Sequence, residues 1–369
     1  MRTITKAFLI CGLALLTAAW SASLTEACSV FRVTAKDGTI MSGRTMEFGS
    51  DLKPGLIAVP RGRKFVSPAP DAKTGLSWTS RYGYVATNVF GIEGAVTDGM
   101  NEAGLTFSAL WFEVDTRYQD VGPRDRDKAI AHMMVGSLIL GRFATVGEAT
   151  EAIRGVKVFA MEVPQMGKAP PGHFILYDAK GGCVVVEYEQ GELRIHENPL
   201  GLMTNSPNFP WMVTNLRNYV GMTSEQRTTQ NFSGIETRPT GGGSGMLGLP
   251  GDITPPSRFV RMAVMTRFAD PPENAAQALN LAAHIISTLH IVKGMSVTRG
   301  PDKSITASST TQWASFRDIT NRIFYFRTYD NFTLRKIDLK QLDFSGGGTK
   351  MIPLYGDAEV VQDITGRLR

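Results

Sequence analysis

Cys28 occupies the one position in this chain where a cysteine gains a second reactive group. It directly follows residues 24–27 (Leu-Thr-Glu-Ala), the end of a predicted export leader. Cleavage after Ala27 would make Cys28 the first residue, with a thiol and a free α-amine together. An α-amine has an unperturbed pKa of about 7.7–8.0, so it can take the proton of its own thiol without a histidine. The position predicts a self-contained cysteine nucleophile.

Residues 1–27 have the composition of a secretory signal peptide. Arg2 and Lys6 precede an apolar stretch at 7–16 that is too short to span a bilayer, and small residues follow. Thr25-Glu26-Ala27 is an acceptable cleavage site, although small residues between positions 19 and 23 offer cuts upstream. We therefore expect a bacterial protein that is exported to the periplasm or secreted.

Two other interpretations of this segment stay open. In a lipoprotein, Cys28 would be lipidated and its amine blocked, but Thr25 and Glu26 stand where a bulky aliphatic and a small residue are normally found. Cleavage upstream would instead leave Cys28 as an ordinary buried cysteine, which is a common place for this residue type.

Composition favours a single globular domain at residues 28–369. The chain has 369 residues, of which 43% are hydrophobic and 20% charged, as in ordinary globular proteins. Its formal charge of +5 is spread along the chain without a basic run, which argues against nucleic-acid binding. No segment after the leader is apolar for long enough to span a membrane, so we expect no stable membrane insertion after cleavage.

The cysteine count favours a free thiol over a disulfide scaffold. Of the three cysteines, Cys11 lies in the leader, which leaves Cys28 and Cys183. An exported chain with so few cysteines is not held together by disulfides, and an unpaired reactive thiol is the natural interpretation.

Hydrophobic periodicity predicts strands, then helices, then strands in blocks, which indicates an α+β fold. Strands are expected at 28–35, 39–48, 56–66, 82–89, 105–112, 173–178, 183–188, 192–197, 310–317, 322–329 and 332–339. Helices are expected at 126–140, 146–156, 211–219, 257–269 and 273–289. The glycine-rich segment 240–245 is expected to form a mobile loop inside one domain.

Six short motifs occur along the chain in the order seen in one known family. They are Cys28-Ser29; Gly43-Arg44-Thr45-Met46-Glu47; Asp98-Gly99-Met100-Asn101-Glu102-Ala103-Gly104-Leu105; Met203-Thr204-Asn205-Ser206-Pro207; Gly248-Leu249-Pro250-Gly251-Asp252 with Ser257-Arg258-Phe259; and Thr311-Gln312-Trp313 with Tyr325-Phe326. With them, nearly the whole predicted mature chain resembles the choloylglycine hydrolases, a family that includes penicillin V acylases and conjugated bile salt hydrolases.

The resemblance implies a fold and a reaction. The fold would be the αββα four-layer sandwich of the N-terminal nucleophile hydrolases, and the reaction would be amide cleavage by the cysteine alone. Neither a metal nor an organic cofactor is implied, and the partner would be a small acyl-amide substrate. Family members often form tetramers, so a homotetramer is expected by resemblance.

The resemblance also implies roles for individual residues. Cys28 would be the nucleophile and its amine the base. Arg44, 16 positions later as in the family, would stabilise the thiolate. The amide of Asn205 would contribute to the oxyanion hole, where one such donor is worth about 10²–10³ in rate. Arg258 matches a further arginine of the family site.

Two positions depart from the family pattern. Glu47 stands where an aspartate normally contacts the α-amine; the alternative is a solvated glutamate outside the pocket. Trp111 stands where an asparagine or tyrosine completes the oxyanion hole with its backbone N–H, which survives any change of side chain. Trp111 and Phe48 are candidate walls of the acyl pocket, although core packing is the expected role of Phe48.

The departure at Trp111 resembles the penicillin V acylase branch of Gram-negative bacteria. Penicillin V and N-acyl homoserine lactones are therefore the leading substrates, which includes quorum quenching as a role, and conjugated bile salts come next. An inactive secreted binding protein on the same fold is the alternative from another class.

Other enzyme classes have less support. A papain-like protease needs a histidine beside the thiol, yet the histidines lie in no recognisable signature: His132, His173, His196, His284 and His290. A zinc enzyme is disfavoured because no His-Glu-x-x-His motif occurs.

Overall fold

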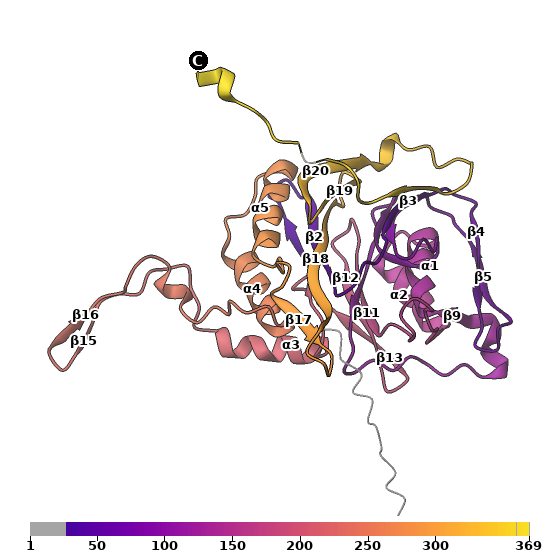
Figure 1. Ribbon diagram of the computed structural model, residues 1–369, viewed down its shortest axis with the longest axis horizontal. Helices are drawn as coiled ribbons and strands as arrows, with labels where there is room; N and C mark the ends of the chain where they lie inside the picture. The colour runs from indigo at the N-terminus through magenta and orange to yellow at the C-terminus, as the bar shows by residue number, and fades with distance from the viewer. Residues whose placement is uncertain (1–26, 359, 369) are drawn as a thin grey trace, which may run out of the picture.

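The computed structural model describes residues 27–358 and 360–368, so the predicted leader, apart from Ala27, lies outside the described residues. Two antiparallel sheets face each other, with helices on both outer sides (Figure 1). The predicted α+β architecture of four layers, αββα, is therefore confirmed.

The first sheet has the order β14-β1-β2-β18-β19-β20, with β17 paired to β18. Its strands are β1 (Ala27–Thr34), β2 (Ile40–Phe48), β14 (Leu202–Met203), β17 (Ser296–Arg299), β18 (Ile305–Asp318), β19 (Ile323–Thr328) and β20 (Asn331–Asp338). Its outer side is covered by α3 (Phe209–Asn215), α4 (Pro255–Phe268) and α5 (Ala275–Ser287) (Figure 1).

The second sheet has the order β13-β12-β11-β8-β7-β6-β3-β21. Its strands are β3 (Gly55–Val59), β6 (Tyr84–Asn88), β7 (Val96–Asn101), β8 (Thr106–Trp111), β11 (Gly172–Tyr177), β12 (Cys183–Glu189), β13 (Glu192–Glu197) and β21 (Lys350–Pro353). Two helices pack on its outer side, α1 (Val135–Arg142) and α2 (Val146–Gly155) (Figure 1).

Strand β2 is buried along its whole length because α5 packs on one face and the second sheet on the other. Gly43 makes this close approach possible. A Cβ atom at Gly43 would lie 2.8 Å from the ring of Phe31 and 3.4 Å from Ile286 of α5. Because both faces of β2 are covered, the charged side chains that this strand carries are buried between the layers.

A buried ion pair joins the two sheets. Arg317 of β18 pairs with Asp98 of β7, and both side chains are fully buried. Ser315 donates to Asp98 at 2.5 Å, and Arg317 donates to Ser42 at 2.9 Å and to Ser108 at 2.7 Å. This network fixes how the sheets lie against each other, because a buried charge is tolerated when it is paired and hydrogen-bonded.

Smaller elements surround the four layers. Beyond α1 and α2 lie β4 (Lys64–Pro68), β5 (Thr74–Thr79), β9 (Ala129–Ala131) and β10 (Lys157–Phe159) (Figure 1). The short helices are η1 (Pro123–Lys128), η2 (His132–Met134), η3 (Leu216–Tyr219), η4 (Ser244–Met246), η5 (Leu339–Gln341) and η6 (Thr365–Leu368).

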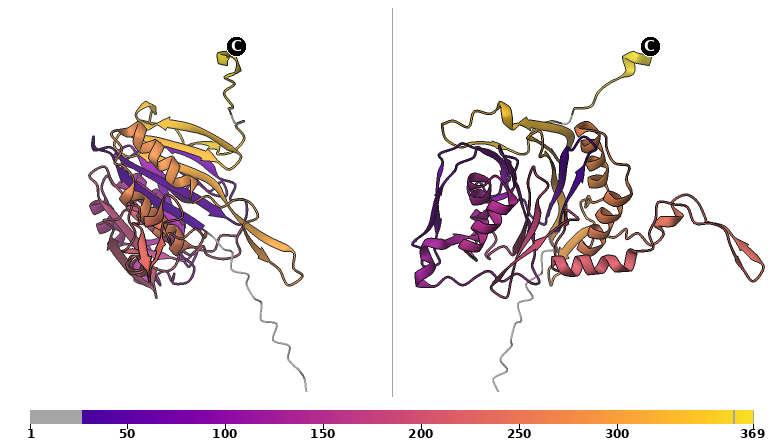
Figure 2. Two further views of the ribbon diagram at one scale, coloured as in Figure 1. Left: turned by 90° about the vertical axis from the view of Figure 1, so that its left-hand side faces the viewer. Right: turned by 180° about the vertical axis from the view of Figure 1, so that it is seen from behind.

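An arm leaves the domain after η3. It carries the hairpin of β15 (Gln230–Phe232) and β16 (Ile235–Thr237) and extends away from the layers (Figure 2). The glycine-rich segment 240–245 lies in this arm and is mostly exposed. In the part of the chain that the structure describes, none of the helices has the length and apolar character needed to cross a bilayer.

Two predicted elements are wrong. The helix expected at 126–140 is interrupted, because residues 129–131 pair in parallel with residues 157–159 and α1 begins only at Val135. The strand expected at 56–66 is two strands in different sheets, separated by a turn in which Gly62 has a φ of 76°. In both cases a distant pairing decides the structure, and local propensity does not.

Candidate active site

The structure brings together five of the residues predicted for the site. Cys28 follows Ala27 at the start of β1, Arg44 and Glu47 lie on β2, Asn205 follows β14, and Arg258 lies in the first turn of α4. All five are buried, and Cys28 is 3% exposed. The hairpin of β1 and β2 is closed by a short turn, so Arg44 and Glu47 return beside the start of β1.

Arg258 and Asn205 together hold the backbone of Cys28. Arg258 donates through Nη1 to the carbonyl oxygen of Cys28 at 2.6 Å and to the hydroxyl of Ser29 at 2.6 Å. Its Nη2 donates to Oδ1 of Asn205 at 2.7 Å, and the same oxygen accepts from the backbone N–H of Cys28 at 2.7 Å. Burial lowers the pKa of Arg258, which the charges of Glu47 and Cys28 oppose. These bonds fix the nitrogen of Cys28.

The other end of the Asn205 amide reaches the second sheet. Its Nδ2 donates to the carbonyl oxygen of Trp111 at 2.8 Å. An amide nitrogen carries two hydrogens, so one N–H remains after this bond. In the predicted role, this second N–H is the one that would meet an oxyanion.

His173 supports the loop that carries Asn205, and no sequence motif predicted this role. Its Nε2 lies 2.9 Å from the carbonyl oxygen of Thr204, and its Nδ1 lies 3.0 Å from Glu187. The ring stacks on Phe112 at 4.4 Å between centroids. The residue before Asn205 is therefore held by a buried side chain of the second sheet.

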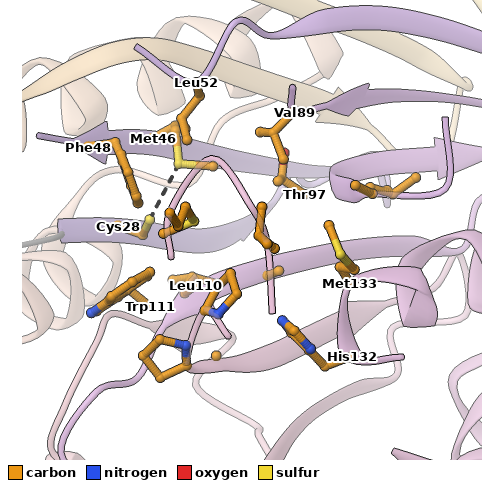
Figure 3. A pocket seen from close by; sticks show the side chains of 18 of the residues that line it. Cys28, Met46, Phe48, Leu52, Val89, Thr97, Leu110, Trp111, His132 and Met133 are labelled. Atoms are coloured by element: carbon orange, nitrogen blue, oxygen red, sulfur yellow. Dashed lines mark hydrogen bonds between the residues drawn. The ribbon is translucent and has the colours of Figure 1, made fainter. Parts of the chain in front are cut away.

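The environment of the Cys28 thiol contains opposing influences. Burial raises its pKa, the charge of Arg44 lowers it, and the charge of Glu47 raises it. Hydrogen bonds from the backbone of Glu47 and Trp111 lower it further. Sγ lies 3.8 Å from Sδ of Met46 (Figure 3). The backbone of Trp111 therefore lies beside the sulfur, where the predicted second oxyanion donor would have to be.

Arg44 is a buried cation that is only partly hydrogen-bonded. Its Nη2 donates to the carbonyl oxygen of Ala109 at 2.7 Å and lies 3.8 Å from Sδ of Met46. Nε and Nη1 are buried and have no hydrogen-bond partner among the described residues. Its positive charge is thus not neutralised by a direct ion pair with an acidic side chain, and it acts on the Cys28 thiol.

Glu47 is fully buried, so the alternative of a solvated glutamate is wrong. Its carboxyl group accepts from Thr45 at 3.0 Å and from Thr311 at 2.7 Å. Burial raises the pKa of Glu47 to about 7, against the lowering effect of Arg258. In the hairpin register Glu47 lies opposite Ala27, directly beside the start of the predicted mature chain.

An apolar cavity of about 110 Å³ opens beside Cys28. Phe48 and Trp111 form its walls near the thiol, with ring centroids 5.7 Å apart and planes at 77° (Figure 3). The indole N–H of Trp111 donates to Glu113 at 3.3 Å, and the ammonium of Lys168 lies 5.0 Å from the indole. Other lining residues were not predicted, including Met46, Leu52, Val89, Leu110, His132, Met133 and Met166.

The histidines do not supply a base to the thiol. His132 lines the cavity but lies across it from Cys28 (Figure 3). Over residues 27–358 and 360–368, no three side chains of the His, Cys, Asp or Glu type are grouped to hold a metal ion. The arrangement therefore joins a buried thiol, a nearby cation and backbone donors at the mouth of an apolar cavity.

Comparison with known proteins gives concordant matches. Residues 28–352 match the model of the linear amide C–N hydrolases, choloylglycine hydrolase family. The bile salt hydrolase/transferase of Clostridium perfringens is 28% identical over 327 residues, which cover 88% of this chain and 95% of that protein.

Solved structures show the same fold. The crystal structure of a cysteine-to-alanine variant of conjugated bile acid hydrolase from Clostridium perfringens has a TM-score of 0.80 and 26% identity, covering 91% of this chain and 99% of that one. Penicillin V acylase from Agrobacterium tumefaciens has a TM-score of 0.72 and 25% identity, covering 89% and 92%.

Proposed function

The chain belongs to the choloylglycine hydrolase family of linear amide C–N hydrolases, and on this premise we propose that it cleaves small N-acyl amides with an apolar acyl group. Penicillin V and N-acyl homoserine lactones are the leading substrates. The observation that carries this proposal is the apolar cavity with aromatic walls at the Cys28 thiol. The proposed active form is exported, begins at Cys28 and is a homotetramer.

The first step of the proposed mechanism prepares the nucleophile. Cleavage after Ala27 frees the Cys28 nitrogen, which Oδ1 of Asn205 already accepts from at 2.7 Å. The free amine takes the proton of the thiol, as an amine with a pKa near neutrality can. The uncompensated cation of Arg44 favours the thiolate, whose burial otherwise disfavours it.

In the second step the thiolate attacks the carbonyl carbon of the substrate. A C–S bond forms, and the carbonyl π electrons move to oxygen, where the backbone N–H of Trp111 and the second N–H of Asn205 would hold the charge. When the C–N bond breaks, the leaving amine takes the proton from the Cys28 ammonium. Water then attacks the thioester and the Cys28 amine accepts its proton. The C–S bond breaks, which releases the carboxylic acid and leaves the thiolate and the ammonium group of Cys28.

The size and lining of the cavity favour a slim acyl group. At about 110 Å³ the cavity is smaller than the roughly 300–1,000 Å³ of sites for drug-sized ligands. A phenoxyacetyl or unbranched fatty acyl group suits this volume, and Phe48 and Trp111 can pack against it. Conjugated bile salts are the second candidate, supported by the name of the Clostridium perfringens relative.

The decisive experiment combines the start of the chain with substrate preference. The exported protein is analysed by intact mass and N-terminal sequencing, and hydrolysis of penicillin V, a long-chain N-acyl homoserine lactone and glycocholate is measured. We expect a chain that begins at Cys28 and a kcat/KM for one of the first two substrates at least about tenfold above that for glycocholate. Cys28→Ala should lose at least about 10³-fold in activity.

Each other outcome selects a different conclusion. Faster hydrolysis of glycocholate would establish the second candidate. A fully active chain that begins upstream of Cys28 would refute the N-terminal nucleophile. A chain that begins at Cys28 and hydrolyses none of the three would favour an inactive binding protein. Cys183→Ala is the matched control, because Cys183 lies on β12 outside the cavity and should not be needed for activity.

A further inference from the structure

His132 places a hydrogen-bond donor without a partner in the wall of the acyl cavity. Its side chain is 5% exposed and lines the cavity. Nδ1 accepts from the backbone N–H of Met161 at 3.2 Å, whereas Nε2 is buried and has no partner among the described residues. Nδ1 thus takes part in a hydrogen bond that supports the fold, whereas Nε2 does not.

The bond to Met161 fixes which nitrogen carries the proton. Because Nδ1 accepts a hydrogen bond, it holds no hydrogen, and the neutral ring must carry its hydrogen on Nε2. Burial lowers the pKa of His132 to about 4, which the nearby backbone of Phe159 opposes only in part, so the ring is neutral near pH 7. Nε2 is therefore a neutral donor and not a cation or a base.

The ring is also held in place. Tyr118 stacks on it, with centroids 4.7 Å apart, and the Tyr118 hydroxyl donates to the carbonyl oxygen of Pro170 at 3.0 Å. Directly before His132, the backbone N–H of Ala131 donates to Ser67 at 2.8 Å. The donor therefore cannot turn away to reach another acceptor without breaking these contacts.

The other side chains of the cavity offer no free acceptor to this donor. Besides Cys28 and His132, the side chains in its lining that carry an N–H or O–H group are those of Thr97, Trp111 and Tyr118, and the indole of Trp111 is a donor only. The Thr97 hydroxyl lies 3.1 Å from that of Thr87 and 3.3 Å from the Thr87 carbonyl oxygen, so it already has partners. A buried donor left unpaired costs about 1–3 kcal/mol, and an acceptor on a ligand would remove that cost.

We propose that His132 is a specificity residue that donates through Nε2–H to an oxygen on the part of the acyl group remote from the scissile carbonyl. The position follows from the view in Figure 3, where His132 lies across the cavity from Cys28. The preferred acyl group is then an apolar chain or ring with one ether, hydroxyl or carbonyl oxygen at that depth. The inference rests on the proposed function, because it assigns a subsite of the same cavity.

Two substitutions separate the two nitrogens of His132. Gln places an amide nitrogen near the position of Nε2 but offers no acceptor to Met161. Asn places an acceptor near the position of Nδ1 but has no donor near Nε2. The pair therefore distinguishes recognition of a ligand from support of the fold, because each variant keeps one of the two hydrogen bonds.

The test uses the exported protein and an oxygen scan of the substrate. N-acyl homoserine lactones of equal chain length carry one ether oxygen at successive positions, and an all-carbon chain is the reference. For the wild type we expect one remote position to raise kcat/KM about tenfold to a hundredfold over the reference, in line with one paired buried donor. His132→Asn should bring this ratio to about one, and His132→Gln should keep most of it.

Three results would contradict the proposed role of His132. A flat oxygen scan in the wild type would show that Nε2 is satisfied by water and would overturn the proposal. The same ratio in wild type and His132→Asn would do so as well. Loss of the ratio in His132→Gln but not in His132→Asn would show that the residue acts only through Met161.

A binding measurement separates this proposal from the proposed function. The free acids of the same series are titrated calorimetrically into Cys28→Ala, which needs no catalysis. If no amide is hydrolysed but the oxygen preference appears in the Kd values, the hydrolase proposal fails and the His132 subsite stands. If amides are hydrolysed and neither assay shows the preference, the subsite fails and the hydrolase stands. If no amide is hydrolysed and no acid binds, both proposals fail.

Discussion

Two clusters of buried charge lie along the same strand pair, β2 and β18, and differ in how their charges are paired. Near one end, Arg317 forms a direct ion pair with Asp98 of the facing sheet. Toward the other end, the carboxyl group of Glu47 accepts from two threonine hydroxyls, and within the described chain it forms no ion pair. Arg44, between them, keeps two buried nitrogens without partners.

The difference in pairing distinguishes a cluster that stabilises the fold from a cluster that acts on the proposed site. A direct pair neutralises its own field and holds two layers together, so little of its charge acts on neighbours. Charges that are buried but kept apart act on whatever lies between them, and here that is the start of β1 with Cys28. The strand pair of β2 and β18 thus carries one cluster that stabilises the fold. The other cluster keeps buried charge without an ion pair at the proposed site, which costs stability.

The largest effect is expected from breaking the scaffold cluster. Asp98→Ala leaves Arg317 buried without a counter-charge, which should lower the free energy of unfolding by about 3–5 kcal/mol in urea titrations. Ser315→Ala, which removes one hydrogen bond to Asp98, should cost only about 1 kcal/mol. Equal losses in the two variants would contradict the assignment of Asp98 and Arg317 as a pair that joins the sheets.

A smaller, pH-dependent effect is expected at Glu47. In the chain that keeps Ala27, burial raises the pKa of Glu47 to about 7, from 4.5 when the group is exposed. The protonated form is thus favoured by folding, and this contribution is complete below pH 4.5 and lost as the pH rises through 7. Glu47→Gln should therefore be more stable than the wild type by about 3 kcal/mol above pH 8, with the difference vanishing toward pH 4.5.

The measurement for Glu47 is chemical denaturation from pH 4.5 to 9 on a chain in which Ala27 is retained. A stability difference that stays constant across this range would show that Glu47 is ionised throughout. Removal of Ala27 should shrink the difference, because an ammonium group at Cys28 would favour the ionised carboxylate.

The smallest effect on free energy is expected at Arg44, where activity and stability should separate. Arg44→Met removes the cation that favours the thiolate, so kcat/KM and the rate of iodoacetamide alkylation should fall at least about tenfold. Stability should change by less than about 1 kcal/mol, since Met replaces a cation with no acidic partner. The matched change Arg317→Met should show the reverse, with a marked loss of stability. If Arg44→Met destabilised the chain as strongly, the contrast between the clusters would be wrong.

The sequence was informative where short-range structure decides geometry. The turn at Asp37-Gly38 closes a hairpin, so a residue 16 positions after Cys28 has to return beside it, and the structure places Arg44 there. The alternation of the strands and the block order of elements likewise indicated an α+β fold, whereas the four-layer arrangement was implied by the family resemblance. The roles of these residues were supplied by family resemblance, because spacing alone does not distinguish a site arginine from a surface one.

Other parts of the site could not be predicted because distant contacts create them. His132 lies in a segment with helical periodicity, and only its neighbours' pairing with residues 157–159 turns it toward the cavity. Thr311 belongs to one of the six family-like motifs, yet its role as a hydrogen-bond donor to Glu47 arises only because β18 pairs with β2. Met46 and Met133 resemble any core methionine until a cavity is found beside them.

The pairing of Ala27 within β1 would impose an order of events on the proposed maturation. Ala27 is 6% exposed and lies opposite Glu47 in the hairpin. Peptidases cut accessible segments, and the bond between Ala27 and Cys28 is buried and paired with β2 in the folded chain. A cut there has to come before β1 closes onto β2. A molecule that folds first would keep its nitrogen in a peptide bond, where the lone pair is delocalised into the carbonyl group and cannot act as a base. In the proposed mechanism, the order of cutting and folding would therefore decide whether a given copy becomes active.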